Sequence, residues 1–132
     1  MYIRLAQKSE LKSISCSIRN KKIDYNTARH VKEDLENGRL FVLIDNDKII
    51  ASCALVEEIN YNYTAIKRLV IFKKENYGKG YASQFIKFFI DTVDSSLGCT
   101  PWIDNKTMKK LLEKFGFQFQ YIFSQNYCFY LR

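Results

Sequence analysis

The sequence is poor in the residues that build metal sites and disulfide frameworks. It has one histidine, His30, and its four cysteines, Cys16, Cys53, Cys99 and Cys128, lie far apart with no C-x-x-C pair among them. A structural zinc site would find almost no ligands here, so we expect no bound metal. The default for these thiols is four reduced side chains, buried or half-buried. A Cys16 or Cys99 nucleophile would need a basic partner, and the sequence places none beside either.

Long apolar runs are also missing. No segment has the roughly 18 uninterrupted apolar residues of a membrane span, and the first ten residues, MYIRLAQKSE, lack the apolar stretch of a signal peptide. We therefore expect a cytoplasmic protein that has no membrane partner.

The charged residues form no block or tail. Lys and Arg number 21 against 14 Asp and Glu, which gives a net charge of +7, but the basic residues are scattered along the chain. Such a surface attracts anions, which include nucleic acid, acidic lipid and phosphorylated metabolites, and charge alone does not choose among them. The simplest interpretation is a solvated, mildly basic surface. No nucleic-acid-binding module is recognisable.

With one proline, no repeat and no low-complexity tract, the 132 residues predict a single domain, 1–132. At 47% hydrophobic and 15% aromatic residues, the chain can bury a substantial core. Apolar periodicity and turn residues predict an α/β fold with a mixed sheet, in the order β-α-α-β-β-β-α-β-α-β-β. The predicted ranges are strand 2–6, a helix through Leu11, Ile14 and Ile18, helix 25–37, a hairpin over 40–56, strand 64–72, a helix with Ala82, Phe85, Ile86, Phe89, Ile90 and Val93 on one face, strand 99–103, helix 105–115, and strands 117–123 and 127–131.

Local signals predict where several of these elements begin and end. Ser9 and Asp24 are the predicted caps of the first two helices. The second helix is expected to stop at Asn37-Gly38, and the helix over 105–115 at Gly116. The cluster Asp45-Asn46-Asp47-Lys48 predicts the hairpin turn.

The stretch NYGKGYA, residues 76–82, lies between a predicted strand and the most strongly patterned helix. A helix start offers backbone N–H groups without intrahelical partners, and the peptide dipoles add partial positive charge there. Gly78 and Gly80 allow a sharp bend and a close approach of phosphate to the amides, while Ala82 keeps the first turn narrow. Lys73, Lys74 and Lys79 add cationic charge. The stretch therefore suits a diphosphate, although a plain turn without a ligand also fits its spacing.

Other phosphate-binding loops fit this stretch less well. A Walker loop needs G-x-x-x-x-G-K-[ST], whereas Gly80 is followed by Tyr81 and has no suitable glycine before it. A dinucleotide-binding fold would need glycine at Ser83, and too little chain follows to complete a doubly wound sheet.

On these residues the sequence resembles the GNAT N-acetyltransferase superfamily. The acyl-CoA motif of that family, Q/R-x-x-G-x-G/A, falls on Tyr77–Ala82, with Tyr77 in place of the usual Gln or Arg. A second family motif, N-x-x-A-x-x-L-Y-E-K-x-G-F, falls on NKTMKKLLEKFGF. The matching residues of the second motif are Asn105, Leu111, Glu113, Lys114, Gly116 and Phe117. The close resemblance covers about residues 64–117, and the remainder agrees in element order.

The resemblance implies a GNAT-like acyl-CoA N-acyltransferase fold with acetyl-CoA as the acetyl donor. Main-chain groups of the fourth strand would pair with the pantetheine arm, the glycine loop would hold the diphosphate, and Asn105 would contact the cofactor arm near its thiol end. Helix capping is the alternative role for Asn105, and the two roles are compatible. The cofactor-binding residues implied in this way are Val70, Ile71, Phe72, Tyr77, Gly78, Lys79, Gly80, Tyr81, Ala82, Ser83 and Asn105.

The resemblance further implies direct attack of an amine on the acetyl thioester, which needs a neutral amine. At pH 7 a lysine-type amine of pKa ~10.4 costs about 4–5 kcal/mol to deprotonate, whereas an α-amine near pKa ~8 costs about one pKa unit. The tyrosine that many relatives use as the acid corresponds here to Leu112, and the fourth strand, TAIKRLVIF, has no carboxylate to act as a base.

Candidate catalytic residues are therefore few. Glu57 and Glu58, at the end of the predicted third strand, are the candidate catalytic pair, although carboxylates at such positions are more often plain surface residues. His30, with Asp34 one turn later, is most simply part of a solvent-exposed helix face. Three tyrosines, Tyr63, Tyr121 and Tyr127, are within reach of the expected cleft.

The sequence therefore predicts an acetyl-CoA-dependent N-acetyltransferase that acts on a small-molecule or protein amine. The charge of +7 disfavours polycationic acceptors and favours a neutral or acidic small amine or a protein amino terminus. Two alternatives remain: a CoA-binding or regulatory module without catalysis, and a basic nucleic-acid-binding α/β domain. A homodimer is left open.

Overall fold

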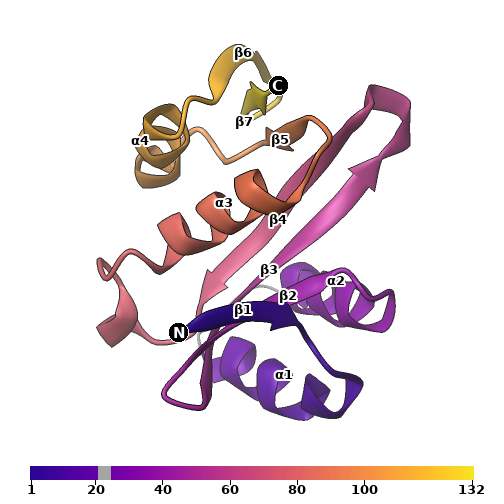
Figure 1. Ribbon diagram of the computed structural model, residues 1–132, viewed down its shortest axis with the longest axis vertical. Helices are drawn as coiled ribbons and strands as arrows, with labels where there is room; N and C mark the ends of the chain where they lie inside the picture. Colours follow the sequence, from indigo (N-terminus) through magenta and orange to yellow (C-terminus); the bar gives the residue numbers. More distant parts are fainter. Residues whose placement is uncertain (21–24) are drawn as a thin grey trace. The chain divides into compact units, whose positions relative to one another are not determined.

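The computed structural model describes residues 1–20 and 25–132 (Figure 1). The strands are β1 Tyr2–Leu5, β2 Leu40–Asp45, β3 Lys48–Glu58, β4 Tyr63–Ile71, β5 Leu97–Cys99, β6 Gln118–Phe123 and β7 Asn126–Leu131. The helices are α1 Leu11–Asn20, α2 Tyr25–Glu36, α3 Tyr81–Thr92 and α4 Lys106–Lys114, with 3₁₀ turns at Lys8–Glu10, Ile59–Tyr61 and Lys74–Asn76. This order of strands and helices confirms the predicted one.

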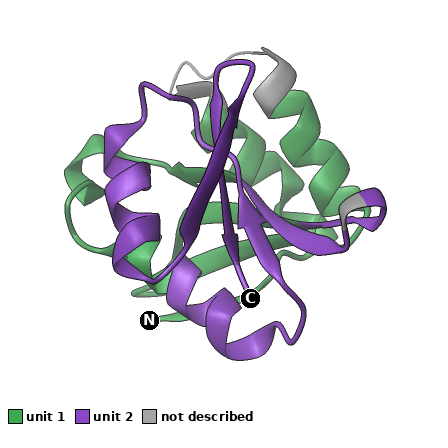
Figure 2. Cartoon of the chain, turned by 90° about the horizontal axis from the view of Figure 1, so that it is seen from above, with its two compact units in different colours: residues 1–55, 68–85 green, residues 56–67, 86–132 purple. Residues whose placement is uncertain are grey.

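The strands are ordered β1-β2-β3-β4-β5-β7-β6. Of the strand pairs, β4 and β5 are parallel, while β1–β2, β2–β3, β5–β7 and β6–β7 are antiparallel, so the predicted mixed sheet is confirmed. Contacts cluster in two compact units, residues 1–55 with 68–85 and residues 56–67 with 86–132 (Figure 2). No helix in the described part of the chain has the length and apolar character needed to cross a membrane.

In the first unit, β2 and β3 form a hairpin whose turn is the predicted cluster. Asn46 and Asp47 both have positive φ, 50° and 62°, and Asp45 pairs with Lys48 across the turn. Two central residues with positive φ are typical of the type I′ turn that matches the twist of hairpin strands. The hairpin prediction is therefore confirmed at its turn as well as in its strands.

The predicted end of α2 is confirmed, while the predicted cap of the first helix is wrong. Gly38 has a φ of +69° directly after α2. Ser9 lies inside the 3₁₀ turn that precedes α1, and Gln7 is the N-cap of that turn. Glu10 completes a capping box with Gln7: its carboxylate accepts from the Gln7 N–H at 2.8 Å and pairs with Arg4 at 2.7 Å. A glutamate in the first turn can reach back to the amide before it. The predicted cap Asp24 lies outside the described residues.

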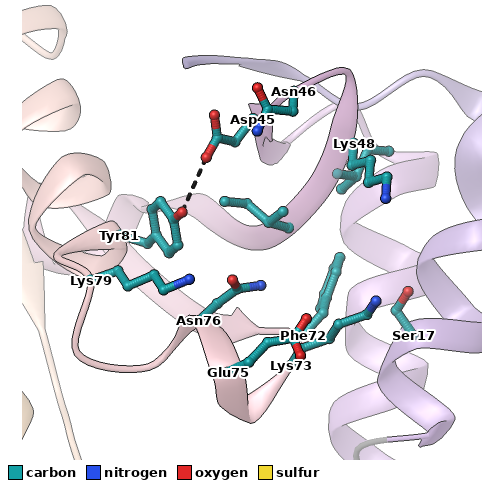
Figure 3. Close-up of a pocket in the computed structure, with 12 residues that line it drawn as sticks. Ser17, Asp45, Asn46, Lys48, Phe72, Lys73, Glu75, Asn76, Lys79 and Tyr81 are labelled. Carbon is teal, nitrogen blue, oxygen red and sulfur yellow. Dashed lines mark hydrogen bonds between the residues drawn. The ribbon is translucent and has the colours of Figure 1, made fainter.

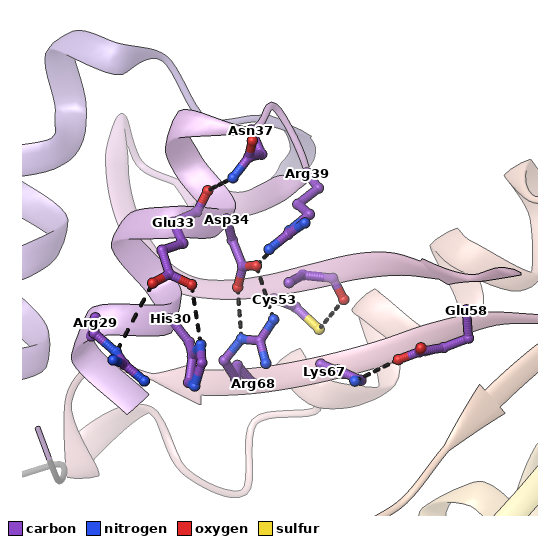
Figure 4. Close-up of polar contacts among 11 residues, drawn as sticks. Arg29, His30, Glu33, Asp34, Asn37, Arg39, Cys53, Glu58, Lys67 and Arg68 are labelled. Atoms are coloured by element: carbon purple, nitrogen blue, oxygen red, sulfur yellow. Dashed lines mark hydrogen bonds and ion pairs between the residues drawn. The ribbon is translucent and has the colours of Figure 1, made fainter. Parts of the chain in front are cut away.

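The expectation that His30 and Asp34 share a solvent-exposed helix face is wrong for Asp34. This side chain is fully buried in the first unit, where its carboxylate is held by two guanidinium groups (Figure 4). Arg68 donates to both oxygens, at 2.7 and 2.8 Å, and Arg39 donates to one of them at 2.7 Å. His30 instead lies beside the half-buried Glu33, with 3.3 Å between Nδ1 and Oε2. Helical periodicity alone does not reveal Asp34 as buried, because its partners come from later parts of the chain.

In the second unit, the predicted strand 99–103 is displaced. Strand β5 covers Leu97–Cys99, and the segment after it makes only an isolated bridge between Trp102 and Asn126. Pro101 has no N–H to donate to a strand ladder, so regular pairing ends before it.

Helix α4 follows its predicted boundaries closely. The Oδ1 atom of Asn105 accepts from the Met108 N–H at 3.2 Å, and Gly116, with a φ of +89°, ends the helix. Leu112 is fully buried on its inner face.

The buried Asp34 predicts a large loss of stability on neutralisation. In Asp34→Asn, two arginines lose their shared anion, and we expect the free energy of unfolding to fall by about 3–5 kcal/mol. Glu36→Gln in the same helix is the matched control, since exposed Glu36 pairs with Lys32 only at 4.0 Å and its loss should cost about 0.5 kcal/mol or less. Urea denaturation measures both; equal stability of the two variants would contradict the role given to Asp34.

Candidate cofactor-binding site

The loop between β4 and α3 has the backbone geometry of an open cradle. A 3₁₀ turn closes it on one side, through hydrogen bonds of 3.0 Å from Asn76 N to Lys73 O and from Tyr77 N to Lys74 O. Gly78 and Gly80 then adopt φ values of +74° and +80°, which glycine alone reaches without strain. A Cβ atom placed on either glycine would have no other atom within 4 Å, so the space in front of both is open. The loop can therefore admit a ligand directly against its main chain.

The start of α3 supplies donors to the same space. The first backbone hydrogen bond of the helix runs from Gln84 N to Gly80 O at 3.1 Å. The N–H groups of residues 81–83 are thus the ones that a helix start leaves without intrahelical partners. Together with the helix dipole they favour an anion. Lys79 is exposed within the loop and adds a full positive charge.

The side chain of Tyr81, at the start of α3, is buried. Its hydroxyl donates to Asp45 Oδ2 at 3.1 Å, which ties the start of α3 to the β2–β3 turn (Figure 3). Burial, followed by the hydrogen bond to the Asp45 carboxylate, raises the pKa of Tyr81. The phenol is therefore a protonated donor that anchors the helix start.

A cavity of about 380 Å³ lies beside the loop, between it and the β2–β3 turn (Figure 3). Its charged lining consists of three lysines, Lys48, Lys73 and Lys79, and two carboxylates, Asp45 and Glu75. With three lysines against two carboxylates, the formal charge of the lining sums to +1. Lys48 and Asp45 were not predicted as part of the site, because they belong to the hairpin turn rather than to the glycine stretch.

The end of β4 leads into this loop. Val70 and Phe72 are buried, and the Phe72 N–H donates to Ile50 O at 3.0 Å. That N–H is engaged by the neighbouring strand, so the expected pairing of Phe72 with a pantetheine arm does not extend to its amide donor. The pairing expected of Val70 and Ile71 stays a prediction.

The other predicted site residues, Glu57, Glu58 and Asn105, belong to the second unit. Asn105 caps α4, as described above. Glu57 is exposed, and Glu58 forms an ion pair of 2.6 Å with Lys67 (Figure 4). Glu58 would have to leave this ammonium group in order to accept a proton from another amine. No observation tests a catalytic role for either glutamate.

Tyr63 lies against Tyr130, with ring centroids 5.1 Å apart, and its ring covers the Cα of Gly98. Burial and then the Glu58 charge raise the pKa of Tyr63, and burial and then a hydrogen bond with Tyr121 raise that of Tyr130. Tyr130 was not predicted as part of the site, because no motif falls on it, whereas Tyr63 and Tyr121 were both candidates. Tyr127, the third candidate, instead lies under Lys109, with 5.4 Å between the Nζ atom and the ring centroid.

The cysteines differ from one another more than expected. Cys53, Cys99 and Cys128 are buried, but Cys16 is exposed, so its predicted burial is wrong. Burial raises the pKa of the Cys99 thiol to about 12. Cys99 is therefore protonated at neutral pH and unsuited to act as a nucleophile.

A scan against protein families matches residues 9–117 to the Acetyltransferase (GNAT) family. The chain belongs to the GNAT acetyltransferase family. The mixed sheet and the order of strands and helices described above are thus those of a GNAT acetyltransferase. A search of curated proteins finds no match to the sequence.

Solved structures share the fold over nearly the whole chain. A GNAT-family acetyltransferase from Streptococcus agalactiae has a TM-score of 0.81 at 20% identity, covering 98% of this chain and 93% of its own. One from Bacillus cereus has a TM-score of 0.83 at 16% identity, covering 99% and 96%. The F149A mutant of spermidine N-acetyltransferase SpeG from Vibrio cholerae has a TM-score of 0.77 at 19% identity, covering 99% and 94%.

The thiols provide a test of the burial and pKa described here. At pH 8 a thiol of pKa about 12 is ionised to only about one part in ten thousand, so Cys99 should not react with a chromogenic disulfide reagent. We expect one fast-reacting thiol in the folded protein, and four in denaturant. Cys16→Ser should remove the fast phase; a fast phase that persists in this variant would contradict the assignment.

Proposed function

We propose that this GNAT acetyltransferase transfers an acetyl group from acetyl-CoA to an amine by direct attack in a ternary complex, and that residues 1–132 act as a single domain. The observation that carries the proposal is the pair of glycines with positive φ and open space in front of them, immediately before α3. A phosphate can reach main-chain donors there without a side chain in the way.

In this proposal, the main chain does most of the binding. The amides of residues 78–83 hold the diphosphate, and Lys73 and Lys79 add charge around it. Tyr77 offers no charged contact where relatives have Gln or Arg. The strand residues Val70 and Ile71 present main-chain groups to the pantetheine arm.

Asn105 can fill both of the roles considered for it. Its Oδ1 atom is used in capping, accepting from the Met108 N–H, whereas its amide group retains two N–H donors. We propose that these donors contact the cofactor arm. The cap then fixes the orientation of the side chain, so that the donors point in one direction.

The chain offers few side chains that could act as a general acid or a general base. When bound, acetyl-CoA supplies an activated thioester, and the attacking amine must be neutral. Leu112 has no proton to give, and β4 carries no carboxylate. Glu57 and Glu58 remain the proposed sources of a base. A chain with so little to remove a proton suits an acceptor that is close to neutral already, such as an α-amine.

Two other functions have specific support. The similarity to a spermidine N-acetyltransferase suggests a polyamine acceptor, although at 19% identity the similarity concerns the fold, and the net charge of +7 opposes a polycation. A CoA-binding module without catalysis is favoured by Leu112 and by the absence of a carboxylate from β4.

Substitution of Gly80 tests the binding proposal. In Gly80→Val the side chain fills the open space and strains the loop, so we expect the dissociation constant for acetyl-CoA, measured by calorimetry, to rise at least about tenfold, or ~1.4 kcal/mol. Gly38→Val is the matched control, because Gly38 also has a positive φ and open space but lies at the end of α2. The Gly38→Val variant should lose a similar amount of stability but bind acetyl-CoA as tightly as the unmodified protein. If titration of the unmodified protein with acetyl-CoA released no heat, the binding proposal would be wrong.

An amine panel tests the acceptor class. At pH 7 we expect a higher kcat/KM for α-amines of amino acids or peptides than for spermidine, measured as thiol release, and kcat/KM should rise with pH until the acceptor amine is deprotonated. Because Cys16 is exposed and we expect it to react with thiol reagents, the assay uses Cys16→Ser and a blank without acceptor. Preference for spermidine would contradict the charge argument. Binding of acetyl-CoA without any turnover would favour the non-catalytic module.

A further inference from the structure

The cavity beside the glycine loop is a different space from the open side of the loop. Lys79 and Tyr81 line the cavity, whereas Gly78 and Gly80, whose open space the diphosphate is proposed to enter, do not. Side chains from α1, from the β2–β3 turn and from the segment after β4 complete the lining. Cofactor binding to the main chain of the loop therefore assigns no ligand to this space of about 380 Å³.

Three lysines, Lys48, Lys73 and Lys79, line the cavity without ion-pair partners. None of them pairs with a carboxylate of a described residue, although Asp45 and Glu75 line the same space. Four lysines elsewhere in the described ranges do form such pairs. An ammonium group that no carboxylate holds is available to an anionic ligand.

Two of these lysines come from different walls of the cavity. Lys48 follows the β2–β3 turn, and Lys73 belongs to the segment after β4. Figure 3 shows both side chains extending toward the part of the cavity that Ser17 of α1 lines. A phosphate group placed there would meet two ammonium groups, which bind phosphate as point charges.

The rest of the lining suits a small polar body attached to that phosphate. Ile49, Ile50 and Phe72 provide an apolar surface. Asn46 and Asn76 add amide groups that both donate and accept hydrogen bonds. Sites for small molecules combine these two kinds of surface, in volumes of roughly 300–1,000 Å³. The cavity lies at the lower end of this range, and a lining charge of +1 suits one phosphate better than a chain of phosphates.

We propose that the cavity binds a phosphomonoester of a small polar metabolite, and that this ligand weakens the binding of acetyl-CoA. The second part rests on the proposed function. Lys73 and Lys79 line the cavity and also add charge around the diphosphate, so the two ligands draw on the same ammonium groups. A phosphate in the cavity also brings a like charge toward the diphosphate. The effect is reciprocal, because acetyl-CoA weakens the binding of the phosphomonoester by the same factor.

Both walls of the cavity are held in place by hydrogen bonds within the protein. The Tyr81 hydroxyl donates to Asp45 at 3.1 Å, which joins the start of α3 to the β2–β3 turn. The Phe72 N–H donates to Ile50 O at 3.0 Å, which joins the segment after β4 to β3. Binding therefore requires little rearrangement of the main chain, and a preorganised site favours affinity.

Calorimetry with glycerol 3-phosphate and glucose 6-phosphate, without acetyl-CoA, tests the site. We expect at least one of these esters to bind one molecule per chain, with a dissociation constant of about 1 mM or below. Glycerol and glucose should not bind, because they lack the charge that the lysines attract. Inorganic phosphate should bind more weakly than the better ester, because it lacks the body. If neither ester binds, the proposal is wrong.

A pair of lysine variants locates the bound ester. Lys48→Ala should weaken its binding at least about tenfold. Lys74→Ala is the matched control, since it removes the same charge from an exposed lysine that does not line the cavity, and it should bind the ester as the unmodified protein does. Equal losses in the two variants would reduce the effect to overall charge. Unchanged binding in Lys48→Ala would place the phosphate elsewhere, and either result would overturn the proposal.

Titration of acetyl-CoA in the presence of saturating ester tests the coupling. We expect the dissociation constant for acetyl-CoA to rise at least about fivefold in the unmodified protein and to stay unchanged in Lys48→Ala. No rise in the unmodified protein would overturn the coupling. Weaker acetyl-CoA binding by Lys48→Ala without ester would overturn the proposal, because the cavity would then belong to the cofactor. If the ester binds through Lys48 but acetyl-CoA does not bind at all, the proposed function is wrong and the phosphate site stands.

Discussion

The buried carboxylate of Asp34 sets the geometry on which the first unit depends. It joins α2 to Arg39 before β2 and to Arg68 in β4, through hydrogen bonds of 2.7–2.8 Å. Arg68 has a φ of +53°, a conformation that costs a non-glycine residue about 1–3 kcal/mol and persists only when its surroundings fix it. The two-pronged bond to Asp34 provides that fixation. Side chains alternate between the two faces along a strand. The departure from extended geometry at Arg68 therefore decides toward which face each side chain from Leu69 to Phe72 points, just before the glycine loop.

Much of the fold could be predicted because its signals are local. Hairpin turns, helix ends and apolar periodicity involve residues within a few positions of each other, and the glycine loop is a local backbone device. Two features that the sequence did not reveal depend on residues far apart in the chain. Asp34 is buried by a partner 34 positions later, and Tyr81 is anchored by a carboxylate 36 positions earlier. A short segment of sequence contains only one member of each pair, so local patterns cannot reveal these contacts. The displaced β5 has a more elementary reason, since Pro101 was counted as a strand residue despite lacking a donor.

The same distinction separates the binding half of the candidate site from its catalytic half. An amide at the start of a helix is a donor whatever side chain it carries, so the loop can be recognised although Tyr77 departs from the family motif. Proton transfer requires a particular side chain at a particular place. Leu112 stands where the family resemblance places the acid, and β4 has no carboxylate to act as a base. The main-chain donors of the loop can therefore be predicted from its glycines and the helix start, whereas acid and base roles must be sought among side chains whose positions the motifs do not reveal.

Gly98 differs from the four glycines at turns and helix ends, all of which have positive φ. Its backbone suits any residue, but the ring of Tyr63 occupies the volume where a side chain would stand. Only glycine, which has no Cβ, leaves room at this position for the Tyr63 ring where it contacts Tyr130. Even the methyl group of alanine would displace the Tyr63 ring, and with it the edge-to-face contact between Tyr63 and Tyr130 that joins β4 to β7.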